Sequence, residues 1–212
     1  MVKLSNAAKK VKEDLKKIDI PWEGLNPEVR LFLHGVKPAI SRDLQSRLST
    51  ILVENYPSIV TPRDRGVYGT ANALIFQDAY RMYEYTQKTY VSESYMYEHD
   101  NGSVFDPCLK SSCADLGITL GYPPSACEWF AEDLKNDVSS PDRLIIYYHG
   151  MQFVTHKSLV AENIKWLRDN RPVPESIQNE EYVRSLYSSC TNWEEFIHVS
   201  FDEFLSSSLH QG

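Results

Sequence analysis

The stretch LGITLGYPPSACEWF, residues 116–130, decides how the middle of the chain folds. It holds two consecutive prolines, Pro123 and Pro124, directly after Gly121 and Tyr122. A proline disfavours the helical conformation of the residue before it, so no helix can run through this pair. The chain therefore turns here, and Pro124 has the fixed φ and missing N–H donor that suit the first turn of a new helix.

An apolar stripe follows the turn. Ala126, Phe130 and Leu134 recur at four-residue spacing, with Cys127 beside them. This spacing predicts a helix over residues 125–135 that buries one face. The stretch therefore holds two short elements that meet at a Gly-Tyr-Pro-Pro corner, which brings a cysteine, a tyrosine and a tryptophan close together.

Length and composition are those of an ordinary globular chain. The 212 residues include 42% hydrophobic and 24% charged side chains, which suits one hydrophobic core and one or two domains. The net charge of −7 disfavours nucleic acid as a partner, because an acidic surface repels phosphates. Residues 1–20 nevertheless hold six lysines against three acidic residues. The first helix is therefore either a basic partner surface or simply a solvated charged face.

Neither a signal peptide nor a membrane span is expected from the sequence, since no uninterrupted apolar run is long enough. The four cysteines are too few and too scattered for a secreted disulfide framework. We expect a cytoplasmic protein with free thiols and no membrane contact.

Hydrophobic periodicity and chain breakers predict an α+β (or α/β) fold that is mostly helical, with a small sheet. The chain is expected to form a single compact domain over 1–212, in which residues 1–20 are a peripheral amphipathic helix. Further helices are expected over 27–33, 40–55, 71–89, 110–116, 155–170, 177–188 and 193–205. Strands are expected over 58–61, 90–99, 103–105 and 143–149. The last of these, RLIIYYH, is apolar on both faces and is therefore expected to be internal.

The expected loop PRDRGVYGT, residues 62–70, precedes the long helix predicted over 71–89. Arg63 and Arg65, together with free backbone N–H groups at a helix start, can bind an anion, although the spacing matches no nucleotide-binding motif. Asp78 falls on the apolar face of the predicted helix, where a carboxylate needs a partner such as one of these arginines or Arg81. Asp78 is therefore either a salt-bridged residue at the edge of the core or part of a site.

Three cysteines suggest one metal hypothesis. Cys108, Cys113 and Cys127, with His149 as a fourth group, are of the residue types that hold a structural zinc ion. Their spacing is loose and contains no CxxC pair, so buried inert thiols are the alternative.

A second, weaker metal pattern lies near the end of the chain. Glu195 and His198 show the three-residue spacing of helical metal ligands, but a dinuclear site of that kind needs a second such pair.

Cys127 is also a candidate nucleophile. It stands just after the Pro-Pro turn, where the backbone N–H groups of a helix start lower the pKa of a thiol and stabilise an oxyanion. His149 or His156 would then act as the base. At its helical phase, however, Cys127 can equally point into the core as a packing residue.

A polar and aromatic pocket is expected where the strand 143–149 ends near the corner. Tyr147, Tyr148 and His149 lie at the carboxyl end of this strand, and Tyr122 belongs to the corner. Ligands favour the carboxyl ends of internal strands in sheets with crossing helices. A small-molecule site with Tyr122 and Tyr148 as binding residues is one interpretation, and a histidine that merely ends the strand is the other.

Two short motifs resemble those of an uncharacterised archaeal protein family. GVKPA, residues 35–39, is similar to a Gly-x-Lys-Pro-Ala segment of that family, and GYPP, residues 121–124, is similar to the start of its Gly-Tyr-Pro-x-Cys-Cys segment. Ser125 and Ala126 stand where the family has its paired cysteines. The resemblance therefore implies a shared fold unit and no chemistry based on paired cysteines.

The leading functional prediction is a binding or interaction protein, with a homodimer through the first helix as one arrangement. A small enzyme with a site around Arg63, Arg65, Asp78, Cys127 and His149 is the first alternative, and a structural-zinc protein is the second. An enzyme would bring His149 and Cys127 together in a cleft. An interaction protein would instead expose a patch rich in tyrosine or tryptophan.

Overall fold

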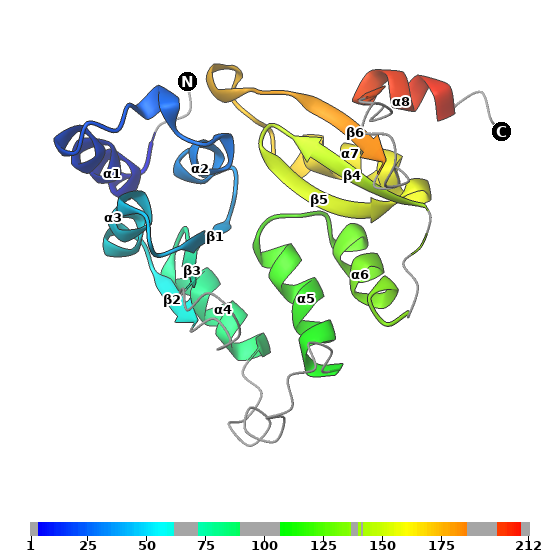
Figure 1. Ribbon diagram of the computed structural model, residues 1–212, viewed down its shortest axis with the longest axis horizontal. Helices are drawn as coiled ribbons and strands as arrows, with labels where there is room; N and C mark the ends of the chain where they lie inside the picture. Colours follow the sequence, from blue (N-terminus) through cyan, green and yellow to red (C-terminus); the bar gives the residue numbers. More distant parts are fainter. Residues whose placement is uncertain are drawn as a thin grey trace. The chain divides into compact units, whose positions relative to one another are not determined.

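A computed structural model describes residues 4–61, 72–89, 107–136, 140, 142–185 and 199–208 (Figure 1). Contacts between Cα atoms divide the chain into two compact units. Unit 1 comprises Met1–Gln87, Thr119–Gly121 and Val173–Gln178, and unit 2 comprises Lys88–Ile118, Tyr122–Pro172 and Asn179–Gly212. Helices and small antiparallel sheets together give the α+β class that the sequence predicts. The single domain over 1–212 stays a prediction.

Unit 1 consists of helices packed on a three-stranded antiparallel sheet with the strand order β1-β3-β2. Its helices are α1 (Asn6–Lys17), α2 (Pro27–Leu33), α3 (Arg47–Asn55) and α4 (Ala79–Thr89), with the 3₁₀ turns η1 (Trp22–Gly24) and η4 (Glu175–Ile177). Its strands are β1 (Ala39–Asp43), β2 (Ser58–Thr61) and β3 (Asn72–Phe76). The central strand β3 buries residues 73–76.

The first helix confirms the prediction of an amphipathic element. Ser5 caps α1 by accepting the backbone N–H of Ala8 at 3.1 Å, as an N-cap serine should. Ala8, Val11 and Leu15 are fully or almost fully buried, and α1 packs against α3. The apolar face of α1 is therefore used inside unit 1.

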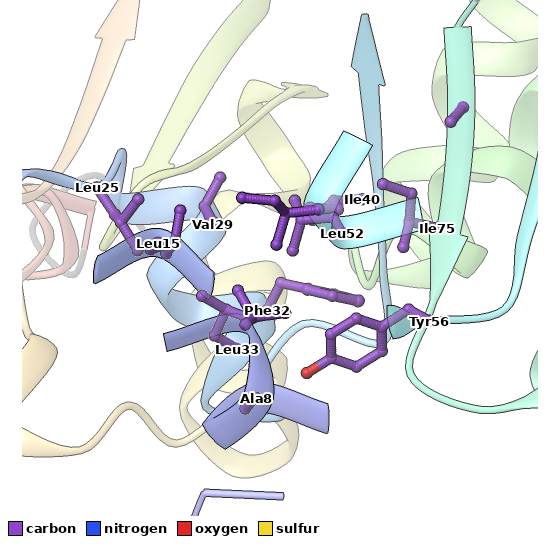
Figure 2. Close-up of a cluster of buried hydrophobic side chains, with 13 residues drawn as sticks. Ala8, Leu15, Leu25, Val29, Phe32, Leu33, Ile40, Leu52, Tyr56 and Ile75 are labelled. Atoms are coloured by element: carbon purple, nitrogen blue, oxygen red, sulfur yellow. The ribbon is translucent and has the colours of Figure 1, made fainter. Parts of the chain in front are cut away.

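The core of unit 1 gathers side chains from the first three helices and from β1 and β3 (Figure 2). Its fully or almost fully buried members are Ala8, Val11, Leu15, Leu25, Val29, Phe32, Leu33, Ile40, Ile51, Leu52, Tyr56, Ala73 and Ile75. The ring of Phe32 meets that of Tyr56 edge-on, with 4.8 Å between ring centroids. Such an edge-to-face pair adds to the stabilisation from burial alone.

Two helix predictions in unit 1 are wrong over part of their length. The helix expected over 40–55 begins only at Arg47, with Ser46 as its cap, because residues 39–43 form β1. The helix expected over 71–89 begins at Ala79, because residues 72–76 form β3. Residues 72–76 are a short apolar run, which periodicity alone cannot assign to a strand or a helix. Residues 39–43 form a strand through their pairing with β3, which lies far along the chain at residues 72–76.

Unit 2 has a four-stranded antiparallel sheet with the strand order β5-β4-β6-β7. Its strands are β4 (Arg143–Tyr148), β5 (Met151–His156), β6 (Glu181–Ser185) and β7 (Val199–Ser200). Its helices are α5 (Pro107–Thr119, whose last residue is grouped with unit 1), α6 (Pro124–Asp133), α7 (Val160–Asn170) and α8 (Phe201–Ser208), with the 3₁₀ turn η3 (Lys157–Leu159). Because β4 pairs on both edges, the prediction of an internal strand at this position is confirmed.

Three helix predictions in unit 2 need correction. The helix expected over 155–170 begins at Val160, since residues 151–156 form β5. The segment 177–188 contains the strand β6 instead of a helix, and the last predicted helix begins at Phe201. In β5 the buried residues Met151, Phe153 and Thr155 alternate with less buried ones, which is the two-residue period of a strand.

The remaining strand predictions, over 90–99 and 103–105, and the loop 62–70 lie outside the described residues. None of the helices that the structure describes combines the length and the apolar composition needed to cross a membrane.

Candidate functional site

The Gly-Tyr-Pro-Pro corner joins α5 to α6, and Pro124 is the first residue of α6, as predicted. The backbone N–H of Tyr122 donates to the carbonyl oxygen of Gly117 at 3.1 Å, which ties the corner to α5. Gly117 also faces Cys127, because a Cβ atom at residue 117 would lie 2.6 Å from the Cys127 Sγ atom. The thiol therefore fills the space that the glycine leaves on α5.

The surroundings of Cys127 are those of a packing residue. Its side chain is only 7% exposed. Burial raises the pKa of the Cys127 thiol to about 12, with smaller contributions from Glu128 and Cys113. A nucleophilic cysteine needs a lowered pKa, because only the thiolate attacks. The start of α6 thus positions Cys127 without activating it.

We expect Cys127 to resist alkylation in the folded protein. With a pKa of about 12, the thiol is protonated at neutral pH, and its burial excludes the reagent. Iodoacetamide treatment at neutral pH, followed by peptide mass spectrometry, should leave Cys127 unmodified in native protein and label it fully in urea. Rapid labelling of Cys127 in native protein would contradict this assignment and restore the nucleophile hypothesis.

Ser125 and Ala126, at the start of α6, are a hydrogen-bonding and a packing residue. The Ser125 hydroxyl donates to the Asn163 Oδ1 atom at 2.8 Å, and the Asn163 Nδ2 atom donates to the Thr155 Oγ1 atom at 2.8 Å. Asn163 and Thr155 are fully buried, and Ala126 is almost fully buried. This chain of hydrogen bonds connects α6, α7 and β5.

The zinc hypothesis involves Cys108, Cys113 and Cys127. Cys113 and Cys127 are free thiols, and burial also raises the pKa of Cys113. Among the residues that the structure describes, no three His, Cys, Asp or Glu side chains form a group that could hold a metal ion. The side chain of Cys108 lies outside the described residues, as do Glu195 and His198, so the zinc site stays a prediction.

His149 lies in the two-residue turn that joins β4 to β5. Its φ is +50°, and Gly150 follows with φ of +111°. Positive φ at both central residues is the requirement of a type I′ turn, which matches the twist of a hairpin. A histidine rarely adopts this conformation, so its side-chain contacts help to hold it there.

Both ring nitrogens of His149 have partners in unit 2. The Nδ1 atom lies 2.7 Å from the Asn179 carbonyl oxygen and 3.1 Å from the Asn179 backbone nitrogen, and the Nε2 atom lies 2.8 Å from Glu181 Oε1. The hydrogen bond from His149, followed by one from Arg168, holds the pKa of Glu181 below its usual value. Arg168 also contacts Asp202 at 3.2 Å. His149 therefore anchors a turn and leaves neither ring nitrogen free to act as a base.

The aromatic pocket expected at the end of β4 does not form as one surface. Tyr148 is 2% exposed and donates its hydroxyl to the Arg171 carbonyl oxygen at 2.9 Å, whereas Tyr147 lies on the opposite face and stacks on Tyr182. Tyr122 stacks on Phe153, with 5.3 Å between ring centroids. Tyr148 is thus a core residue, and Tyr122 is a half-buried residue that packs on the sheet.

The prediction that Asp78 lies on the apolar face of a helix is wrong, because Asp78 precedes α4 and its side chain is exposed. Its carboxylate accepts the backbone N–H of Arg81 at 2.9 Å and pairs with the Arg81 Nε atom at 3.1 Å. It therefore caps the first turn of α4 in the manner of an N-cap aspartate. Arg81 was one of its predicted partners, while Arg63 and Arg65 lie outside the described residues.

Two other features of unit 1 were not predicted from the sequence. Lys37 is fully buried and forms an ion pair with Glu28 at the start of α2. Tyr80 and Tyr83 on α4 are 68% and 59% exposed, the largest exposures among the large hydrophobic residues that the structure describes. The motif GVKPA, which places a lysine between a valine and a proline, was a signal that Lys37 could be buried. The exposed tyrosines were not predicted, because the helix was expected to start before Ala79.

Comparison of the chain with protein-family models, with curated proteins and with solved structures finds no match. Functional inference therefore rests on the geometry of these residues.

Proposed function

We propose that this chain is a cytoplasmic binding protein that contacts another polypeptide through the exposed face of α4. Three of the candidate enzyme residues lack the features that catalysis needs: Cys127 is protonated and packed, His149 has both ring nitrogens engaged, and Asp78 caps a helix. The free thiols of Cys113 and Cys127 suit a reducing compartment.

The observation that carries the proposal is the division of α4 into two faces. Tyr85 packs its ring against Phe76 of β3, with 5.8 Å between centroids, and its neighbours Met82 and Thr86 are half-buried. Tyr80 and Tyr83 occupy the opposite side of the helix, where both rings are mostly exposed. Tyrosine is enriched in protein interfaces because its ring buries a large apolar area while its hydroxyl still forms hydrogen bonds.

A second copy of the chain is the partner that fits this face best. Arg81 and Glu84 are exposed beside the tyrosines, so two α4 helices in antiparallel contact can pair opposite charges across a twofold axis. Unit 1 holds 13 Lys and Arg against 11 Asp and Glu, so it does not share the strong acidity of the whole chain. Because unit 1 is close to neutral, charge repulsion between two copies of unit 1 is weak. Since the apolar face of α1 is buried against α3, we place the dimer contact on α4 instead of on the first helix.

The double variant Tyr80→Ser/Tyr83→Ser tests this proposal. Because central tyrosines carry much of the binding energy of an interface, we expect the dissociation constant of the dimer to rise at least about tenfold. Sedimentation equilibrium over a range of protein concentrations measures it. Lys9→Ser, on the exposed face of α1, is the matched control and should leave the dimer unchanged. A wild-type chain that stays monomeric, or a dimer that Lys9→Ser weakens equally, would refute the α4 interface.

A further inference from the structure

Two cationic side chains, Lys12 and Arg30, and His34 form a cluster beside Trp22 in unit 1. The ring centroids of Trp22 and His34 lie 6.1 Å apart, and the Lys12 Nζ atom lies 4.9 Å from the Trp22 ring centroid. Arg30 stands one helical turn before His34 on α2. These four side chains come from α1, η1 and α2 and are half-buried, so the cluster lies at the surface of the unit.

Several polar atoms of this cluster are shielded from solvent. The two ring nitrogens of His34 and the Arg30 Nε atom have no hydrogen-bond partner within the part of the chain that the structure describes. Arg30 donates from its Nη2 atom to the Ser176 carbonyl oxygen at 3.1 Å, which fixes the guanidinium beside η4. Buried polar atoms almost always have a partner. The Arg30 Nε atom and at least one His34 ring nitrogen carry an N–H, so the cluster offers at least two donors that an added acceptor would satisfy.

The electrostatics of the cluster also favour an anion. Burial lowers the pKa of His34 below its ordinary value, and the charges of Arg30 and Lys12 lower it further. The carbonyl groups at the end of α2 do not oppose an anion strongly, because the backbone N–H groups of residues 34–36 already donate to them. An anion here would receive charge-assisted hydrogen bonds from groups that now repel one another.

We propose that Lys12, Arg30 and His34, beside Trp22, form a binding site for a small tetrahedral oxyanion, such as sulfate or a free phosphate ion. Arg30 and Lys12 supply permanent charge, and His34 supplies a ring nitrogen that takes up a proton as the anion binds. The site is separate from the tyrosine face of α4 and does not depend on the dimer.

Sulfate is the appropriate probe, because its charge does not change in the pH range over which histidine titrates. The imidazole resonances of His34, followed by NMR during sulfate titration of the full chain, should shift in a saturable way. Linkage requires that sulfate raise the pKa of His34 and that sulfate bind more tightly as the pH falls through the pKa that His34 has in the sulfate complex. Sodium chloride at equal ionic strength should not reproduce these shifts.

Arg30→Gln removes a charged donor and should weaken sulfate binding at least about tenfold, because hydrogen bonds to charged groups are stronger than neutral ones. Lys16→Gln, an exposed lysine of α1, is the matched control and should bind sulfate like the wild type. Circular dichroism checks that each variant is folded. His34 resonances that respond equally to chloride, or sulfate binding that Arg30→Gln leaves intact, would overturn the proposal.

Discussion

Replacing Glu28 with glutamine is expected to lower the free energy of unfolding by about 3 kcal/mol, because it removes the carboxylate that pairs with a fully buried ammonium group. Lys37 is fully buried, whereas the Glu28 side chain is 24% exposed. Burial lowers the pKa of Lys37, and the Glu28 carboxylate opposes that shift. The lysine therefore depends on the glutamate far more than the glutamate depends on the lysine.

The different burial of Lys37 and Glu28 predicts different effects for substitutions of the two residues. Lys37→Met removes the buried charge and keeps a similar volume, while the half-buried Glu28 can be hydrated, so we expect a smaller loss than in Glu28→Gln. Glu23→Gln, at an exposed position in η1, is the control and should have little effect. Urea unfolding measures all three variants. A Glu28→Gln variant as stable as Glu23→Gln would show that Lys37 is held by other contacts.

Replacing Gly117 with alanine is expected to lower the free energy of unfolding by about 2 kcal/mol, which is typical of overpacking in a core. Alanine is the better helix former by about 1 kcal/mol, so helix propensity alone predicts the opposite sign. The contact decides the outcome: the new Cβ atom would lie 2.6 Å from the Cys127 Sγ atom and 3.4 Å from the Cys127 Cβ atom. A buried cysteine cannot move away without displacing its neighbours.

The double variant Gly117→Ala/Cys127→Ala isolates this contact. Removing the sulfur makes room for the new methyl group, so the double variant should be more stable than Gly117→Ala alone. The four proteins of the cycle, compared by urea unfolding, give the coupling between residues 117 and 127. Additive effects, without coupling, would mean that Cys127 does not pack on α5.

Local signals in the sequence predict a helix end correctly where residues at that end determine it. The Pro-Pro pair placed the start of α6 correctly, and the helix predicted over 40–55 ends where α3 ends, because prolines act within one turn. Residues 39–43 and 72–76 were misassigned because these strands are defined by their pairing across the sheet, which no local signal contains.

The candidate site was harder to predict than the fold, because side-chain roles depend on neighbours distant in sequence. The position of Cys127 after a helix start suggested activation, but Gly117 and burial make it a packing residue. The position of His149 at a strand end suggested a base, but Asn179 and Glu181, thirty residues away in the chain, occupy both ring nitrogens. Lys37 was overlooked because lysine is almost always exposed.

The most direct test of the proposed binding function is native mass spectrometry of the purified, untagged chain, with elemental analysis of the same sample. We predict a dimer without stoichiometric metal that dissociates in the Tyr80→Ser/Tyr83→Ser variant. A monomer that carries one zinc ion, lost on substitution of Cys108 or Cys113, would contradict the proposal and support the structural-zinc alternative. A monomer that retains a bound small molecule would instead support the enzyme alternative.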